Sequence, residues 1–125
     1  MMNSRLPVVI LSTTSGPEEA SLLARRLVET QTAACVQVIE GARSFYRWDN
    51  RIESAIECLL LIKTTEDNYA AVESMIRTTH EESGWYQTPE ILCLTVAMGS
   101  PEYLSWLLES VAPGNEPRPA NTDPG

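Results

Sequence analysis

A long β-type hairpin in the middle of the chain constrains the fold more than any other feature. Two extended segments, 34–48 and 52–65, flank the pair Asp49-Asn50. Both residue types tolerate a positive φ better than most, so the pair predicts a tight two-residue turn. A two-stranded ribbon on its own is marginally stable in water. The hairpin must therefore pack against further elements or against another chain.

The turn also sets the register of the hairpin. It predicts that Trp48 faces Arg51, that Tyr46 faces Glu53, and that Cys35 faces Thr64. Gly41 interrupts the first arm and could mark a bulge or bend. The second arm ends in the apolar run 59–62, which is typical of a central strand covered on one face and contacted on the other.

The segments around the hairpin alternate between strand and helix patterns. We expect a strand at 6–13, an amphipathic helix at 17–31, a helix from Thr64-Thr65 to Thr79, a loop at 81–88, a strand at 89–96 and a short helix from Pro101. This order, β-α-β-β-α-β with an extra C-terminal helix, predicts the α+β class and a ferredoxin-like sandwich. Four antiparallel strands then carry two helices on one face.

The other face of such a sheet has no helix to cover it. An apolar central strand beneath a bare face indicates a partner chain, so we expect an oligomer. Residues 1–111 are expected to form this single domain. The segment 112–125 is rich in Pro, Gly and Asn and nearly lacks apolar residues, which predicts a disordered tail.

Charge and composition exclude several classes of function. The chain has 17 acidic and 9 basic residues, a net charge of −8, so its surface repels nucleic acid and anionic membranes. It contains no apolar run long enough to span a membrane, and its first apolar stretch reads as a strand, not a signal peptide. Three cysteines without paired spacing suit a reducing compartment. We expect a cytoplasmic protein.

Four separate segments carry a family resemblance: TAACVQVIEGARSFYRWDNRIE, LLLIKT, PEILCLTV and SPEYLSWL. From about Leu6 to about Leu108 the chain resembles the CutA divalent-cation tolerance family. The resemblance implies the ferredoxin-like fold and a homotrimer in which extended strands of one subunit meet the sheet of the next. It also implies a link to tolerance of copper and other divalent metals, and a likeness to the trimers of PII-like signalling proteins.

The chain departs from the family pattern at two places. Asn50 stands where the family usually has Gly. The family's His-Pro-Tyr run is matched by Tyr86, but Gly84 and Trp85 fall at the His and Pro positions. The single histidine of this chain, His80, lies four residues before Gly84. A metal role assigned to the family's histidine is therefore not carried over directly.

Cys35 and His80 are the candidate metal ligands. Thiolates suit soft ions such as Cu(I), and neutral imidazole is a common ligand. The expected register places Cys35 and Cys58 on the same face of the sheet but six positions apart, roughly 20 Å, so one subunit cannot bind one ion through both. A site would need a second subunit, or one cysteine with His80. The alternatives are a cysteine that acts as a small hydrophobe and a histidine on the surface or at the C-terminal end of a helix. No cofactor is expected to be obligatory; copper or another divalent cation is the candidate.

The stretch SFYRWDNRIE has two interpretations. It is a hairpin tip that packs on a neighbouring subunit, where aromatic residues and Arg concentrate. Alternatively it opens a cleft to a small ligand. The cleft would be lined by Tyr46, Trp48, Glu53, Lys63, Tyr86 and Glu90.

An enzyme is not expected, because the chain lacks a phosphate loop, paired metal-binding histidines and a Ser-His arrangement. The sequence thus predicts a cytoplasmic homotrimer that takes part in divalent-metal tolerance, through metal-responsive binding or assembly. Two alternatives stay open. One is a PII-like module that binds a small anion or nucleotide between subunits, and the other is a structural trimeric scaffold.

Overall fold

The computed structural model describes residues 5–84 and 88–114. Its elements, in chain order, are β1 Pro7–Thr14, α1 Pro17–Glu29, β2 Cys35–Trp48, β3 Arg51–Thr65, a 3-10 turn Glu66–Asn68, α2 Tyr69–Ser83, β4 Ile91–Thr95 and α3 Pro101–Ser110. No helix in the described ranges is long and apolar enough to cross a membrane.

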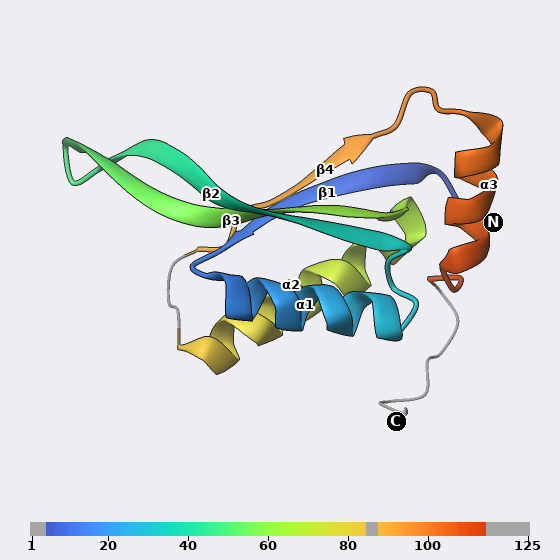
Figure 1. Cartoon of the computed structure of the whole chain (residues 1–125), viewed down its shortest axis with the longest axis horizontal. Coiled ribbons are helices and arrows are strands. Elements are labelled where there is room, and N and C mark those ends of the chain that lie inside the picture. The colour runs from blue at the N-terminus through green and yellow to red at the C-terminus, as the bar shows by residue number, and fades with distance from the viewer. Residues whose placement is uncertain (1–4, 85–87, 115–125) are drawn as a thin grey trace.

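The sheet has the strand order β2-β3-β1-β4, and every neighbouring pair is antiparallel. Helices α1 and α2 lie side by side on one face, and α3 stands at the end of the sheet where β1 begins (Figure 1). The β2–β3 hairpin projects past the helices at the opposite end (Figure 1). The predicted α+β ferredoxin-like sandwich with an additional C-terminal helix is confirmed.

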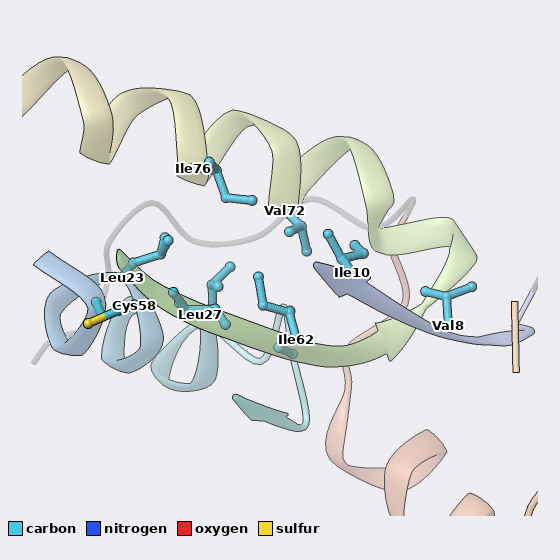
Figure 2. Packing of buried hydrophobic residues seen from close by; sticks show 11 residues of the cluster. Val8, Ile10, Leu23, Leu27, Cys58, Ile62, Val72 and Ile76 are labelled. Atoms are coloured by element: carbon cyan, nitrogen blue, oxygen red, sulfur yellow. The ribbon is translucent and has the colours of Figure 1, made fainter. Parts of the chain in front are cut away.

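The core lies between the sheet and the two helices. Side chains alternate along the central strands, so Ile10 and Ile62 point toward the helices and are fully buried. They meet Leu27 from α1 and Val72 and other apolar residues from α2 (Figure 2). Burying one such side chain contributes about 1.5–3 kcal/mol, so this layer supplies most of the stability of the single chain.

Helix ends follow the local signals in the sequence. Pro17 occupies the first turn of α1, and the hydroxyl of Ser100 caps α3 by accepting a hydrogen bond from the backbone N of Tyr103 at 3.3 Å. The expected loop from residue 81 is wrong at its start, because α2 continues to Ser83. Gly84 ends the helix in a left-handed conformation, with φ 78°.

The hairpin turn is the one predicted. Asp49 and Asn50 have φ values of 56° and 64°, the left-handed pair that a tight hairpin turn needs. Near the turn the register agrees with the prediction, with Trp48 opposite Arg51 and Tyr46 opposite Glu53.

Farther from the turn a bulge changes the register. Gly41 has φ 78°, and the pairing shifts between Ile39 and Ala42. Cys35 consequently pairs with Lys63, where an uninterrupted ladder would have paired it with Thr64. Because strand side chains alternate between faces, this one-residue shift moves Cys35 to the face opposite Cys58. The expected shared face of these two cysteines is wrong.

The face of the sheet away from α1 and α2 is rich in apolar side chains. Leu11 of β1 pairs with Leu61 on one side and Leu92 on the other, and Ile39 pairs with Leu59. Leu92 and Ile39 are both exposed in the single chain. We call this surface, Val9, Leu11, Ile39, Leu59, Leu61, Leu92 and Leu94, the outer sheet face. It is the kind of surface that a partner covers.

A network of hydrogen bonds fixes the C-terminal end of α3 to the start of β1. The Arg5 guanidinium donates to the carbonyl oxygens of Leu108, Val111 and Ala112 at 3.1, 3.0 and 3.3 Å, and to Asp67 Oδ2 at 3.1 Å. We call this network the C-terminal clamp. It satisfies carbonyls that a helix end leaves without intrahelical partners.

The clamp extends into the segment predicted to be a tail. Asn68 Nδ2 donates to the Ala112 carbonyl at 2.9 Å, and the Gly114 backbone N donates to Asp67 Oδ2 at 2.9 Å. A Cβ at Gly114 would collide with the Asp67 carbonyl, so a glycine suits this approach. The ordered body therefore reaches Gly114, three residues past the predicted boundary. The rest of that predicted tail, 115–125, lies outside the described residues.

Candidate functional site

A groove of about 880 Å³ lies where the hairpin leaves the body of the molecule. We call it the hairpin groove. Residues from β1, β2, β3, α2 and the segment before β4 line it: Thr13, Ser15, Ser44, Phe45, Tyr46, Trp48, Ala55, Ile56, Glu57, His80, Thr88, Pro89 and Glu90. Its volume falls in the range of about 300–1,000 Å³ that small-molecule sites occupy.

Aromatic residues of β2 line the groove, with Tyr46 and Trp48 on one face of the hairpin and Phe45 on the other. Phe45, Tyr46 and Trp48 expose 66%, 40% and 62% of their surface. Large aromatic side chains contribute the most to binding when a partner or ligand covers them. In the single chain these three side chains are little buried and contribute little to folding. They are therefore available for contact with a partner or a ligand.

His80 also lines the groove and is buried, with 3% exposure. Its Nδ1 lies 3.0 Å from the Ile76 carbonyl oxygen and 3.5 Å from Glu19 Oε2. Both neighbouring oxygens are acceptors, so Nδ1 carries the hydrogen and fixes the ring tautomer. The interpretation of His80 as a surface residue is wrong; it does lie near the C-terminal end of a helix, as expected.

Glu19 is the acidic partner of His80 and comes from the first turn of α1. Its side chain is buried except for 8% of its surface. Ser15 and Ser83 donate hydroxyl hydrogen bonds to Glu19 Oε1 and Oε2, both at 3.3 Å. A buried carboxylate held this way keeps the imidazole in one orientation. The pair also ties the start of α1 to the end of α2.

The charged residues along the groove are acidic. Glu57 and Glu90 line it, and the Ser44 hydroxyl donates to Glu57 Oε1 at 2.8 Å. No Lys or Arg is among the lining residues in the described part of the chain. A lining of this sign attracts cations and repels phosphate.

The structure brings together some of the predicted cleft residues and separates others. Tyr46, Trp48 and Glu90 line the hairpin groove. Glu53 lies outside it and pairs with Arg51 across 3.5 Å on the hairpin. Tyr86 lies outside the described residues.

Lys63 lies far from the other predicted cleft residues of the same chain. It lies on β3 ten residues from Glu53, roughly 33 Å at about 3.3 Å per residue. Its Nζ is 3.5 Å from the Tyr103 hydroxyl and 5.5 Å from the centre of that ring. This packing against α3 makes Lys63 part of the other end of the molecule. The prediction placed two distant points of one strand in the same site.

Cys35 and His80 also lie far apart in one chain. Cys35 pairs with Lys63, which pairs with Val9, six residues before the groove residue Ser15. This spacing corresponds to roughly 20 Å, and the two side chains lie on opposite faces of the sheet. Across residues 5–84 and 88–114, no group of three or more His, Cys, Asp or Glu is placed to hold a metal ion.

The other two cysteines are poorer ligands. Cys58 is buried in the core beneath α1 (Figure 2). Cys93 lies on β4, where partial desolvation, together with the charge of Glu66, raises the pKa of its thiol. A raised pKa lowers the fraction of thiolate, which is the form that binds metal. Cys35 is half-exposed, so it is accessible in the single chain and is not part of the core as Cys58 is.

Sequence reasoning missed several residues of the groove. Glu19 is not among the predicted site residues, and nothing in its spacing relates it to His80. Phe45 and Glu57 line the groove but are not among the predicted cleft residues. The approach of α1 to α2 is not visible in the sequence, because it depends on how the two helices pack on the sheet.

Known proteins resemble this chain along most of its length. Residues 8–110 match the family of CutA1 divalent ion tolerance proteins. The divalent-cation tolerance protein CutA of Thermus thermophilus is 38% identical over 102 residues, which are 82% of this chain and 95% of the relative. CutA1 from Oryza sativa has a TM-score of 0.79 at 30% identity, covering 87% of this chain and 96% of the other. The periplasmic divalent cation tolerance protein CutA from Archaeoglobus fulgidus has a TM-score of 0.78 at 33% identity, covering 86% and 100%.

Proposed function

This chain belongs to the CutA1 divalent ion tolerance family, and from that membership we propose that it acts as a homotrimer in tolerance of copper or another divalent cation. The match over residues 8–110 is the observation that carries the proposal. It covers the whole described fold apart from the ends, so the metal-related role concerns this domain itself. The proposed location is the cytoplasm, on the grounds of its cysteine usage.

The outer sheet face and the hairpin support the proposed trimer. The outer sheet face is apolar, and the hairpin projects past the body with exposed aromatic side chains (Figure 1). Obligate interfaces typically bury more than about 2,000 Å² and are more apolar than the rest of the surface. Both surfaces would be covered if hairpins and sheets of neighbouring copies packed together.

The proposed mode of metal binding is through separate and incomplete sites. Cys35 and His80 cannot share an ion within one chain, so each would need ligands from a second subunit or from water. Copper binds most nitrogen and sulfur sites more tightly than zinc, nickel or cobalt. Without a four-ligand cage the affinity would be weak compared with a structural zinc site. No permanent cofactor is proposed.

The test is a copper titration under reducing conditions, followed by calorimetry and light scattering. We expect wild type to bind copper, and Cys35→Ser to lose at least tenfold in affinity. The His80→Gln variant reports the second candidate ligand, and Cys58→Ser is the matched control because that thiol is buried in the core. Affinity should fall as the pH drops, since thiolate and neutral imidazole are the binding forms. Equal binding by all four proteins would show that these residues are structural.

A second candidate function is supported by the hairpin groove, which has the size of a ligand site. The PII-like alternative proposed an anion or nucleotide as its ligand. The groove in this chain is lined by Glu57 and Glu90, which oppose phosphate groups. If the groove binds a ligand, the acidic lining favours one other than an anion or nucleotide. A scaffold role would be supported by a trimer that responds to neither metal nor ligand. No catalytic activity is proposed.

A further inference from the structure

We propose that Lys63 forms an ion pair with Glu53 of a neighbouring copy of the chain, and that this pair positions the hairpin on the outer sheet face of that neighbour. The inference rests on the homotrimer proposed above and names one contact within it, so the ion pair can fail while the trimer holds. Three features of the molecule support it: the missing partner of Lys63, the chemistry of the two faces of the hairpin, and the length of the hairpin.

Lys63 lacks an acidic partner in the described part of its own chain. The chain is strongly acidic, with a net charge of −8, and most of its arginines have a carboxylate at 4.0 Å or less: Arg5, Arg25, Arg26, Arg51 and Arg77. The Lys63 Nζ instead lies 3.5 Å from the Tyr103 hydroxyl and 5.5 Å from the centre of that ring. A phenol ring offsets the charge of an ammonium group less than a carboxylate does.

The position of Lys63 makes the missing partner costly in an assembly. It alternates along β3 with the buried residues Ile62 and Thr64 and pairs with Val9, so it lies at the end of the outer sheet face. It is already half-buried in the single chain. A neighbouring copy that covers this face removes more water from Nζ, and an ammonium group that loses water without gaining a partner opposes association. The covering surface must therefore bring a carboxylate.

The two faces of the hairpin differ in charge. Arg43 and Arg47 lie on the face toward the helices, whereas Glu53, Glu57 and Tyr46 lie on the other. The second face continues along β3 into the outer sheet face. A ribbon that presents its arginines to Lys63 would place like charges together, and one that presents its carboxylates would place opposite charges together. Charge thus selects the face that carries Glu53 and Glu57.

Glu53 is the carboxylate of this face best placed to pair. Glu57 already accepts a hydrogen bond from the Ser44 hydroxyl at 2.8 Å. The Glu53 side chain is 39% exposed, and its ion-pair contact is Arg51 at 3.5 Å, with the Arg51 side chain 71% exposed. An exposed pair of this kind contributes little, so Glu53 can exchange Arg51 for Lys63 at small cost.

The hairpin is long enough to reach Lys63 of a neighbour. It projects past the helices (Figure 1), and its stretch from Glu57 to Arg51 spans roughly 20 Å at about 3.3 Å per residue. The outer sheet face from Leu59 to Lys63 spans roughly 13 Å on the same basis. Within one chain Glu53 and Lys63 are roughly 33 Å apart, so this pair can form only between copies.

The experiment uses Lys63 as a unique chemical handle, because it is the one lysine in the chain. A carbodiimide joins an amine to a carboxylate that contacts it, without a spacer. We expect treated wild type to give covalent dimers and trimers on denaturing gels, and peptide mapping to join Lys63 to Glu53. Lys63→Arg keeps the positive charge without the reactive amine, so it should assemble as wild type does and give no such product. Glu53→Gln should also lose the product.

Charge reversal tests whether the contact holds the copies together. Lys63→Glu and Glu53→Lys should each weaken assembly about tenfold or more, measured as mass against protein concentration by light scattering, because each places like charges together. The double variant restores opposite charges and should recover at least about half of the loss on a logarithmic scale. Arg25→Glu is the matched control, since Arg25 lies on the exposed surface of α1, and it should assemble as wild type does.

Several results would overturn the ion pair. A cross-link from Lys63 to a carboxylate other than Glu53, or no cross-linked product, would show that the two groups do not meet. A double variant that assembles no better than either single variant would show that their charges are not coupled. In both cases a wild-type mass of three chains would leave the proposed trimer intact, whereas a wild-type monomer would overturn the trimer and the ion pair together.

Discussion

At one end of the sheet Arg5 donates hydrogen bonds to three backbone carbonyls and to Asp67, whereas at the other end Phe45, Trp48 and Ile52 leave more than 60% of their surface in water. The clamp end is polar and closed. The hairpin end is apolar and open. The two ends belong to the same sheet, because β3 runs from Arg51 at the hairpin to Thr65 beside the clamp.

The contrast between the two ends shows which parts of the molecule stabilise the single chain. At the clamp, hydrogen-bond partners lie within the chain, so the free energy of the clamp is already part of folding. At the hairpin, apolar surface is left unburied, so its contribution of about 25 cal/mol per Å² becomes available when a partner or ligand covers it. We therefore expect clamp substitutions to act on folding and hairpin substitutions to act on association.

The largest effect is expected from the hairpin, in the double variant Phe45→Ser with Trp48→Ser. Aromatic side chains at the centre of an interface each contribute about 2 kcal/mol or more, so the pair should weaken assembly by at least about 4 kcal/mol. Light scattering at micromolar concentration should report about three times the chain mass of 13.9 kDa for wild type and a lower mass for the variant. Leu22→Ser, on the exposed side of α1, is the control and should keep the wild-type mass.

If the double variant has the same mass as wild type and Leu22→Ser, Phe45 and Trp48 are not part of an interface. If wild type itself is a monomer, the proposed trimer is wrong, and the exposed surface of the hairpin must be explained by ligand binding alone.

The next effect is at the clamp. Arg5→Ala removes the donor of four hydrogen bonds and leaves Asp67, whose side chain is 8% exposed, without its charged partner. Loss of a partly buried ion pair of this kind should lower the free energy of unfolding by about 2–3 kcal/mol. Urea unfolding at one fixed protein concentration measures the change.

Arg25→Ala is the matched control, because Arg25 reaches Glu29 on the exposed surface of α1 at 4.0 Å. Exposed pairs contribute little, so this variant should lose less than about 0.5 kcal/mol. A similar loss in both variants would show that the clamp is no stronger than a surface ion pair. If Arg5→Ala also lowers the mass measured by light scattering, the clamp acts on association as well as on folding.

A third effect follows from the acidity of Asp67. Burial alone would raise the pKa of this carboxyl, but hydrogen bonds from Thr65 and Gly114 and the Arg5 guanidinium together lower it. A carboxyl with a lowered folded-state pKa stabilises the fold above its unfolded value near 3.8, and the contribution is lost as pH falls through the folded pKa. Acid unfolding curves should show this loss as a decrease in the free energy of unfolding while the pH falls through the folded pKa.

Asp67→Asn should remove this part of the pH dependence while keeping the size of the side chain. The stability of the variant should then change less between pH 5 and the acid limit than that of wild type. An identical acid profile for the two proteins would contradict the assignment of this contribution to Asp67.

The smallest effect is expected at the hairpin turn. Asn50 has φ 64°, a conformation that Gly adopts more easily than Asn. Gly also has more conformational freedom to lose on folding, so Asn50→Gly should change the free energy of unfolding by less than about 0.5 kcal/mol. Thermal unfolding and light scattering together would show that the turn sets the register without deciding stability or assembly. Asn50→Val is the contrasting variant, because a β-branched residue resists positive φ.

The sequence determined the parts of this protein that depend on neighbouring residues. The order of strands and helices, the turn at Asp49-Asn50 and the Ser100 cap each follow from local propensity and hydrogen bonding. The same holds for the pairs close to the turn, such as Trp48 with Arg51, because the turn geometry fixes their register. The family resemblance followed from the same local motifs.

The tertiary structure decided every feature that joins distant segments. Gly41 was recognised as a place for a bulge, but its effect on the face of Cys35 depended on how the whole ladder adjusted. Lys63 packs against Tyr103 of α3, at the opposite end of its strand from the predicted cleft residue Glu53, and residue type alone does not show this separation. The groove exists because α2 ends beside the base of the hairpin.

His80 and Arg5 show the physical reason. His80 was one histidine near a helix end until the packing of α1 on α2 brought Glu19 to 3.5 Å from its ring. Arg5 was one charge near the N-terminus until α3 returned its carbonyl oxygens to the guanidinium. Local sequence fixes backbone conformation through short-range sterics and hydrogen bonds. The partner of a buried charge is set by how the core packs the elements together, and that packing depends on all of them at once.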